Sequence, residues 1–333
     1  MVFYKSLLRY FTVGRLLNYF WLKTGYYLSR IFRQPFVWGH PFAISIEPTT
    51  VCNLKCPECP TGLSILQRSK GTLDLPNFKH IIDHLPKHTF YVNLFLQGEP
   101  TLNPQLAKMI EYASNRNLFT VVSTNAQLID STLATQLVKV KLSKLIVSMD
   151  GMTQKTYEIY RKNGSLEKVM QALTHIANEK KRLQLQEPIV IIQFIVFEHN
   201  QHELQLLDTL VKQKLADKIE LKSAQIIVGD DIKPPENKNL SRYKVKDELI
   251  IQYKPALNHC SRIWETLVVS WDLATYPCCY DKDGDFPMGN LKSTSPLDVW
   301  KGYTFNKFRR TILANRSGKT MCTQCNEGRH WWD

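Results

Sequence analysis

Apolar runs of two kinds alternate through the middle of the 333-residue chain. Short runs rich in β-branched and aromatic residues predict strands, and longer stretches with apolar residues three or four positions apart predict helices. The strand-like runs cover residues 43–46, 92–96, 118–123, 145–149, 189–197 and 219–228. Helix-like stretches separate them, for example residues 153–161 and 166–181. Strands that alternate with helices are typical of a parallel sheet, so the pattern predicts an α/β fold of six β/α units.

Three cysteines follow the first of these strands, at Cys52, Cys56 and Cys59. Intervals of four and three residues bring their thiolates together on one loop, and Pro57 stiffens the second interval by fixing its own backbone angle. Convergent thiolates bind soft metals or iron–sulfur clusters. A cubane cluster held by three cysteines leaves one iron free for a cofactor or substrate. The alternative is a zinc site, which needs a fourth ligand from elsewhere in the chain.

The C-x3-C-x2-C loop after a first strand resembles the cluster loop of the radical S-adenosylmethionine (SAM) enzymes. The resemblance implies an open, partial (β/α)6 TIM-type barrel with its chemistry at the carboxyl ends of the strands. It implies that Cys52, Cys56 and Cys59 hold a 4Fe-4S cluster that binds SAM. Reductive cleavage of SAM would then produce a 5′-deoxyadenosyl radical that abstracts a hydrogen atom from the substrate. An electron donor such as flavodoxin or ferredoxin is implied as a partner.

Polar motifs after the second and third strands extend the resemblance. Gln97-Gly98-Glu99-Pro100 is similar to the family's glycine–glycine–glutamate motif, with Gln97 at the first glycine position. The resemblance implies that Gly98 allows a close approach to the cofactor and that Glu99 accepts a hydrogen bond from the amino group of SAM. Ser123-Thr124-Asn125 is similar to the family's Thr-Asn-Gly, with Ala126 replacing the glycine. The resemblance implies that Ser123 and Asn125 contact the ribose or the methionyl carboxylate. A Gly-Pro turn and a helix N-cap are the respective alternatives.

The fourth and fifth strands also end in polar residues. Ser148-Met149-Asp150-Gly151, with Arg161 further on, looks like the family's S-x-D-G…R signature. Ser148, Asp150 and Arg161 are therefore predicted cofactor contacts, and the Arg161 guanidinium matches the SAM carboxylate in two-point geometry. The alternative for Arg161 is a surface helix charge. Gln193 and Asn200 flank the end of the fifth strand, where related enzymes contact the adenosine.

The other five cysteines lie in the last eighty residues, around a hairpin-like run at 267–276. Their order resembles the C-terminal auxiliary-cluster extension of the SPASM and twitch radical SAM enzymes. The resemblance implies one auxiliary 4Fe-4S cluster on Cys260, Cys278, Cys322 and Cys325. Cys279 is left over; it could exchange roles with Cys278, donate a hydrogen atom to a substrate radical, or be a buried structural cysteine. Four thiolates ending in C-x2-C also suit a structural zinc site.

Composition divides the chain into four parts. Residues 1–38 are basic, amphipathic and helix-like; 39–228 are the predicted barrel; 229–254 are polar and broken, as in a linker; 255–333 are the predicted auxiliary-cluster domain. The eight cysteines cluster at two ends of the chain instead of spreading as a disulfide framework. Thiolates that hold iron indicate a reducing cytoplasm.

The N-terminal segment carries much of the net charge of +13, because residues 1–46 contain six basic residues and no acid. Basic helices rich in Trp, Phe and Leu bind membrane interfaces, which would place the protein peripherally at the inner face of the membrane. The equal alternative is that this segment packs on the barrel and covers its open end. No run is apolar enough to span a bilayer, and no nucleic-acid-binding fold accompanies the charge.

These observations predict a radical SAM oxidoreductase or transformase with an auxiliary cluster for electron transfer. Its main predicted substrate is a small molecule, sugar or lipid-linked intermediate, because no obvious peptide-binding domain is present. Peptide or protein maturation of the SPASM type is the first alternative. A non-catalytic iron–sulfur protein for electron transfer or scaffolding is the second.

Overall fold

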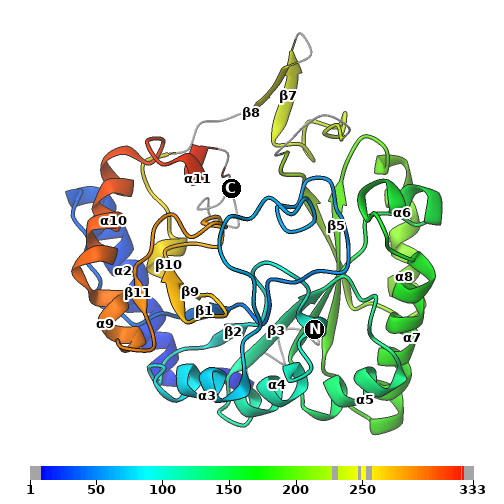
Figure 1. Ribbon diagram of the computed structural model, residues 1–333, viewed down its shortest axis with the longest axis horizontal. Helices are drawn as coiled ribbons and strands as arrows, with labels where there is room; N and C mark the ends of the chain where they lie inside the picture. The colour runs from blue at the N-terminus through cyan, green and yellow to red at the C-terminus, as the bar shows by residue number, and fades with distance from the viewer. Residues whose placement is uncertain (1–8, 227–231, 247–248, 253–256, 324, 326–333) are drawn as a thin grey trace.

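One sheet of nine strands organises the part of the chain that the structure describes (Figure 1). The computed structural model describes residues 9–226, 232–246, 249–252, 257–323 and 325. The strand order is β11-β10-β9-β1-β2-β3-β4-β5-β6. These strands are β1 (Ala43–Ile46), β2 (Tyr91–Asn93), β3 (Phe119–Thr124), β4 (Lys144–Ser148), β5 (Ile189–Val196), β6 (Lys218–Ser223), β9 (Thr266–Val269), β10 (Ala274–Tyr276) and β11 (Gly289–Asn290).

Strands β1 to β6 are parallel, and each lies beside its predecessor in the chain. Helices connect them and cover the outside of the sheet (Figure 1). They are α3 (Leu75–Asp83), η1 (Pro100–Leu102), α4 (Leu106–Ser114), α5 (Ser131–Lys139), α6 (Gln154–Tyr160), α7 (Leu166–Leu183), η2 (Gln201–Leu207) and α8 (Asp208–Lys212). Strands such as β1 are buried along their whole length, which parallel sheets covered on both faces require. The predicted partial barrel of six β/α units is confirmed.

The C-terminal hairpin continues the sheet of the barrel. Strand β9 pairs in parallel with β1, with Ala43 opposite Thr266, and in antiparallel with β10. The predicted hairpin over 267–276 is therefore present, and it is joined to the edge of the barrel instead of forming a separate sheet. After η3 (Arg262–Trp264), the remaining helices of this region are α9 (Pro296–Lys301), α10 (Tyr303–Asn315) and α11 (Thr320–Thr323). This pairing brings the C-terminal cysteines to the side of the first strand.

The segment predicted as a polar linker contains regular structure. Strands β7 (Tyr243–Lys246) and β8 (Leu249–Gln252) form a two-stranded antiparallel sheet that projects at the top of Figure 1. Both strands contain β-branched residues in short runs, a preference that the average polar composition of 229–254 concealed. Residues 227–231, 247–248 and 253–256 of this region lie outside the described part.

The start of the described N-terminal segment packs against the amino ends of the strands, and the helix that follows runs along the side of the barrel. The Tyr10 ring packs edge-on against Phe119, and its hydroxyl lies 2.9 Å from Ser143 Oγ. Helix α2 (Val13–Phe32) follows, capped by Thr12, whose Oγ1 accepts a hydrogen bond from the Arg15 amide. Residues 1–8, including Lys5, lie outside the described part. Within the described residues, no helix combines the length and apolarity needed to cross a bilayer.

Candidate active site

The three loop cysteines lie together at the carboxyl ends of the parallel strands. Cys52, Cys56 and Cys59 line one cavity of about 190 Å³ that opens to solvent. Six of the predicted cofactor contacts line the same cavity: Gly98, Glu99, Ser123, Asn125, Ser148 and Arg161. Motifs from four separate strand ends therefore meet at one place, as the barrel topology requires.

The surroundings of the cysteines suit a bound cluster. Burial raises the pKa of the Cys52 thiol to about 11 and also raises the pKa of Cys56. Such thiols lose their protons when a metal binds, because the metal replaces the missing solvation of the thiolate. Buried apolar residues pack around the loop, among them Leu54, Tyr160 and Phe197. An apolar shell of this kind limits water access to a cluster.

Gly98 holds two strand ends against each other. Its φ is +72°, and a Cβ added there would lie 2.3 Å from the Thr49 carbonyl oxygen and 2.7 Å from that of Val51. Only glycine fits this backbone and this space. The close approach is thus to the lead-in of the cysteine loop, where the Glu99 amide donates to the Val51 carbonyl at 2.7 Å.

Glu99 is buried and accepts hydrogen bonds from both sides. Its Oε1 accepts from Thr124 Oγ1 at 2.6 Å and from Thr101 Oγ1 at 2.7 Å, and its Oε2 accepts from the Asn125 amide at 2.7 Å. Burial raises the pKa of Glu99, and these donors oppose the shift. The bonds hold the carboxylate in one orientation at the cavity wall, which suits recognition of an ammonium group. Sequence reasoning missed Thr124, although it stands inside the motif already singled out.

Asn125 links the end of β3 to the cysteine loop. Its side-chain nitrogen lies 2.8 Å from Asn53 Oδ1 and 3.9 Å from Cys52 Sγ. The N-cap alternative does not describe these contacts, because the amide reaches across to the loop. Asn125 therefore orients the first cysteine as well as lining the cavity.

Arg161 points at the cysteines from the end of α6. Its Nη1 lies 3.8 Å from Cys56 Sγ, and its Nε donates to Asp150 Oδ2 at 2.5 Å. Asp150 is fully buried behind it and also accepts from the Ile195 amide at 2.6 Å. The surface-charge alternative for Arg161 is wrong, since the side chain is mostly buried at the cavity. Asp150 is placed to orient Arg161. It was predicted to contact the cofactor, but it lies behind Arg161 and does not line the cavity.

The two residues predicted from the fifth strand differ in position. Gln193 lies on β5 two residues before Ile195, which lines the cavity, so both side chains share one face of the strand. Asn200 is fully buried, and its side chain bonds to the carbonyls of Asp150 and Ile195 and to the Phe197 amide. The predicted adenosine contact through Asn200 is wrong, because the side-chain amide of Asn200 already forms hydrogen bonds with backbone groups.

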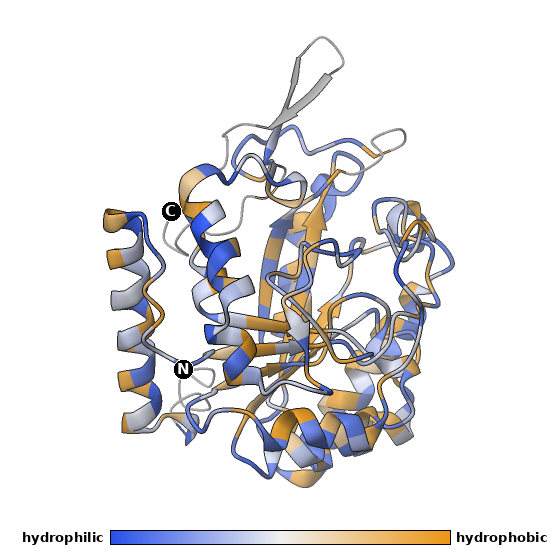
Figure 2. Cartoon of the chain, turned by 60° about the vertical axis from the view of Figure 1, so that its left-hand side comes forward, coloured by the Kyte–Doolittle hydropathy of each residue, from blue (hydrophilic) through white to orange (hydrophobic). Residues whose placement is uncertain are grey.

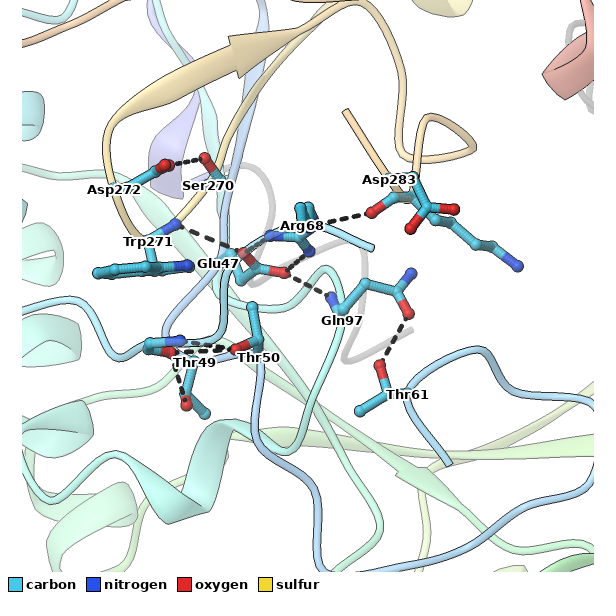
Figure 3. A network of polar contacts seen from close by, with 12 residues as sticks. Glu47, Thr49, Thr50, Thr61, Arg68, Gln97, Ser270, Trp271, Asp272 and Asp283 are labelled. Atoms are coloured by element: carbon cyan, nitrogen blue, oxygen red, sulfur yellow. Dashed lines mark hydrogen bonds and ion pairs between the residues drawn. The ribbon is translucent and has the colours of Figure 1, made fainter. Parts of the chain in front are cut away.

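A polar network that sequence reasoning missed ties the cysteine loop to the C-terminal hairpin (Figure 3). Glu47, fully buried at the end of β1, forms a two-point ion pair with Arg68. The Gln97 and Trp271 amides also point at the Glu47 carboxylate, at 3.3 and 3.4 Å. Arg68 Nε donates to the Lys282 carbonyl at 2.6 Å. Nothing in the local sequence marks Glu47 or Arg68, because their partners are remote in the chain.

Gln97 stands where the family motif has its first glycine, and its side chain forms a hydrogen bond there. Its Oε1 accepts a hydrogen bond from Thr61 Oγ1 at 3.1 Å (Figure 3). Thr61 comes directly after the last cysteine of the loop and Pro60. The departure from the family pattern therefore adds a contact between the second strand end and the cysteine loop.

Four of the five C-terminal cysteines line a second, smaller cavity, which leaves only about 10 Å³ of free space. They are Cys260, Cys278, Cys322 and Cys325, all of them buried. Arg316 lines the same cavity, and its charge opposes the burial that raises the pKa of Cys322. Cys279 is half-buried, with Arg262 Nη1 3.7 Å from its sulfur. The structure thus brings together the four cysteines that were predicted as auxiliary ligands.

A third cavity, of about 240 Å³, lies between the cysteine loop and the C-terminal region. Pro60 and Ile65 line it from the loop, and Asp281 and Lys282 line it from the hairpin side. Burial raises the pKa of Asp281 to about 6. Burial lowers the pKa of Lys282, while the nearby Cys59 and Cys279 oppose that shift. Titratable groups with perturbed pKa values in a cavity are typical of substrate sites.

Comparison with known proteins agrees with this geometry. Residues 46–209 match the model of the radical SAM superfamily, and residues 260–326 match the iron–sulfur cluster-binding SPASM domain. The mycofactocin maturase MftC of Mycobacterium tuberculosis is 32% identical over 138 residues, covering 41% of this chain and 34% of the relative. The Fe-coproporphyrin III synthase of Methanosarcina barkeri is 31% identical over 131 residues, covering 39% and 33%. The chain therefore matches about a third of the length of these curated relatives.

Solved structures share the fold over most of the chain. BtrN in complex with AdoMet and 2-DOIA has a TM-score of 0.56 and 18% identity, covering 86% of this chain and 93% of BtrN. Streptococcus suis SuiB bound to the precursor peptide SuiA has a TM-score of 0.65 and 14% identity, covering 87% and 72%.

The partial barrel and its three-cysteine loop define a class that uses an iron–sulfur cluster together with SAM. The chain belongs to the radical SAM superfamily and carries a C-terminal SPASM iron–sulfur domain. Its cofactors are a 4Fe-4S cluster with SAM and an auxiliary iron–sulfur cluster. The zinc alternative for the first loop is thereby excluded.

Proposed function

We propose that this protein is a SPASM-type maturase, a radical SAM oxidoreductase that modifies a peptide or protein side chain. The observation that carries the radical chemistry is the single cavity in which Cys52, Cys56 and Cys59 face Glu99 and Arg161. The peptide substrate is supported by the relatives, which include mycofactocin maturases and the PqqA peptide cyclase of Bradyrhizobium diazoefficiens, 28% identical over 116 residues. This substrate class replaces the small molecule that the sequence had favoured.

In this proposal each side chain of the cavity has a defined task. Cys52, Cys56 and Cys59 would hold the 4Fe-4S cluster, and SAM bound with it would supply the radical chemistry that removes one hydrogen atom from the substrate. Glu99, held by Thr124 and Asn125, accepts hydrogen bonds from the amino group of SAM. Arg161, held by Asp150, offers its guanidinium to the carboxylate of SAM. Both charged groups are oriented before SAM arrives, so binding does not have to order them.

The substrate is proposed to enter the cavity between the two cysteine sites. Pro60 from the first site and Lys282 from the C-terminal region line this space together. Lys282 Nζ donates to Gln225 Oε1 at 3.3 Å, so the ammonium group is held toward one wall. An auxiliary cluster on Cys260, Cys278, Cys322 and Cys325 would accept the electron left on the substrate, making the net reaction an oxidation. Ligation by four thiolates leaves that cluster without an open iron, which favours electron transfer.

A small-molecule substrate is the second candidate, and the comparison with BtrN favours it. That structure is described as a complex with AdoMet and 2-DOIA, and the shared fold covers 93% of it. The two candidates differ only in what fills the cavity beside Lys282.

We also propose that the protein works in the cytoplasm and receives its electron from flavodoxin or ferredoxin. None of the eight cysteines is paired in a disulfide, as expected in a reducing compartment.

The test is SAM cleavage by protein reconstituted without oxygen. Release of 5′-deoxyadenosine with dithionite and SAM is expected, together with roughly eight irons per chain for two clusters. The Cys56→Ala variant is the control: it should keep about half of the iron and release no 5′-deoxyadenosine. A fully loaded protein that releases none would instead support the non-catalytic electron-transfer or scaffold alternative.

The substrate class is tested by adding candidate peptides or small molecules to the same reaction. Faster 5′-deoxyadenosine release, with a mass loss of about two hydrogens from a peptide, supports the maturase. The same response to an amino sugar or polyol, and to no peptide, would support the second candidate.

A further inference from the structure

Helix α2 turns its apolar side away from the protein. Its buried side consists of Arg15, Asn18, Leu22, Gly25, Tyr26 and Ser29, which recur at helical spacing. The opposite side carries large apolar residues that are exposed: Val13, Leu16, Leu17, Phe20, Trp21, Tyr27, Ile31 and Phe32. A surface helix of a soluble protein normally has the reverse arrangement.

Apolar packing of Leu22 and Tyr26 in the core and several polar contacts together attach the inner side of α2. Arg15 Nη1 donates to the Tyr10 carbonyl at 2.7 Å, and Asn18 exchanges two hydrogen bonds with the backbone of His40. Ser29 Oγ accepts from the Phe36 amide at 2.8 Å. The exposed apolar side is therefore not needed to hold the helix on the barrel.

The outward side forms one continuous apolar strip, here called the α2 strip and made of the eight exposed residues given above. Ile31 is 71% exposed and Phe20 is 60% exposed. Trp38, which is also exposed, extends the strip, because its ring lies 6.0 Å from that of Trp21 in an edge-on contact. Figure 2 shows α2 at the edge of the molecule beside the C-terminal helices.

The charges around the strip are mostly basic. Neither α2 nor the neighbouring α10 contains an acidic residue, and the first acid in the chain is Glu47. Glu265 lies beside α2 and is paired with Lys23. Arg33, at the end of α2, is exposed and donates to the Leu313 carbonyl of α10. Lys307 and Arg310 are exposed on α10 itself. An exposed apolar helix face with Trp and Tyr at its sides and an excess of basic charge nearby fits an anionic bilayer surface.

We propose that the α2 strip docks the protein on a membrane surface that contains anionic phospholipid. Trp21, Phe20 and Ile31 insert at the level of the headgroups, while Arg33 and the α10 cations contact lipid phosphates. This inference does not depend on the radical chemistry proposed above. The strip lies outside both cysteine cavities, so an enzyme that failed to bind membranes could still cleave SAM.

Vesicle flotation of the reconstituted full-length protein tests the proposal. Binding is expected to vesicles of phosphatidylcholine with phosphatidylglycerol and to be weaker with phosphatidylcholine alone. Raising the salt to about 0.5 M should weaken binding, because the screening length falls to about 4 Å. The double variant Phe20→Glu/Ile31→Glu should lower the affinity by about tenfold or more, with unchanged iron content.

The matched control replaces two exposed apolar residues on the opposite side of the barrel, Leu206→Glu/Val211→Glu. It should float like the unchanged protein. The proposal is wrong if the unchanged protein does not float on either vesicle, or if Phe20→Glu/Ile31→Glu floats equally well. It is also wrong if the protein is a dimer in solution that this variant separates, because a second copy would then cover the strip.

Discussion

The two cysteine sites of this protein are built in opposite ways. Cys52, Cys56 and Cys59 come from one short loop and face a polar cavity of about 190 Å³ open to solvent. The auxiliary cysteines come from three separate segments and enclose only about 10 Å³ of free space with apolar walls. Three ligands and an open polar side suit a cluster that binds SAM, whereas four ligands and an apolar enclosure suit one that passes electrons.

The comparison also shows how the sites are held relative to each other. The Glu47–Arg68 ion pair connects the end of β1 with the cysteine loop, and Arg68 continues to the carbonyl of Lys282 (Figure 3). The Trp271 ring adds to this contact, since its Nε1 donates to the Ser69 carbonyl at 3.2 Å. The loop is thus fastened on both sides. The part of the loop after Cys59, which contains Arg68, is where the first cysteine site and the C-terminal region meet.

Replacing single cysteines of the auxiliary site by alanine is expected to give the largest effect. Cys278→Ala should remove the auxiliary cluster, leaving roughly four of eight irons, while Cys279→Ala should keep nearly all of them. The reason is that Cys278 lines the cavity with the other three cysteines and Cys279 does not. Iron analysis and the visible spectrum measure this. Loss of iron in Cys279→Ala alone would mean that the two cysteines have exchanged roles.

Breaking the buried ion pair should destabilise the contact between the sites. Arg68→Gln leaves the Glu47 carboxylate buried without its partner, which costs about 3 kcal/mol or more of unfolding free energy. Urea unfolding without oxygen measures the change. The double variant Glu47→Gln/Arg68→Gln should recover part of the loss, because the orphaned charge is removed.

The exposed pair of Arg182 and Glu179 is the matched control. Arg182→Gln should not change the unfolding curve measurably, because exposed ion pairs are screened by water. Equal effects of Arg68→Gln and Arg182→Gln would contradict the role given to the buried network.

Replacing the arginine beside Cys56 should sharpen the contrast between the open site and the closed one. Arg161→Lys keeps the charge near Asp150 but loses the two-point geometry toward a carboxylate. The rate of SAM cleavage at low SAM should fall by about 10- to 100-fold, the loss expected for one charge-assisted hydrogen bond. Iron content should stay the same. Unchanged cleavage with Arg161→Lys would remove Arg161 from the SAM contacts.

The smallest expected effect concerns pH and Asp281. Its pKa of about 6 lies above the usual value of 3.8, so the folded protein binds this proton more tightly than the unfolded chain. The stabilisation is complete below about pH 4 and is lost as the pH rises through about 6. Asp281→Asn should reduce this loss by about 1 kcal/mol, as thermal unfolding between pH 4.5 and 7.5 would measure. Parallel pH profiles for both proteins would contradict the assignment.

Much of the fold and the open site followed from local patterns. Strands β1, β3, β4 and β5 lie within one residue of their predicted runs, and β2 ends three residues earlier than predicted. The agreement follows because buried parallel strands are short apolar segments. The motifs at Gly98, Asn125 and Arg161 are contiguous, and the barrel topology brings the ends of parallel strands together. The prediction for Asn200 was wrong because a buried side-chain amide at a strand end can form hydrogen bonds with the backbone as well as with a ligand. The hairpin of β7 and β8 was not predicted because the polar composition of residues 229–254 concealed its short apolar runs.

The sequence by itself determined the reaction class, since the cysteine spacing and the strand-end motifs are local features. It also contained the amphipathic period of α2, but not the direction in which the apolar side points. The tertiary structure alone decided that direction, the partnership of Glu47 with Arg68, and the convergence of Cys260, Cys278 and the last two cysteines. These depend on contacts between residues far apart in the chain. The pairing of β9 with β1 places the C-terminal region beside the first strand, and no local pattern encodes it.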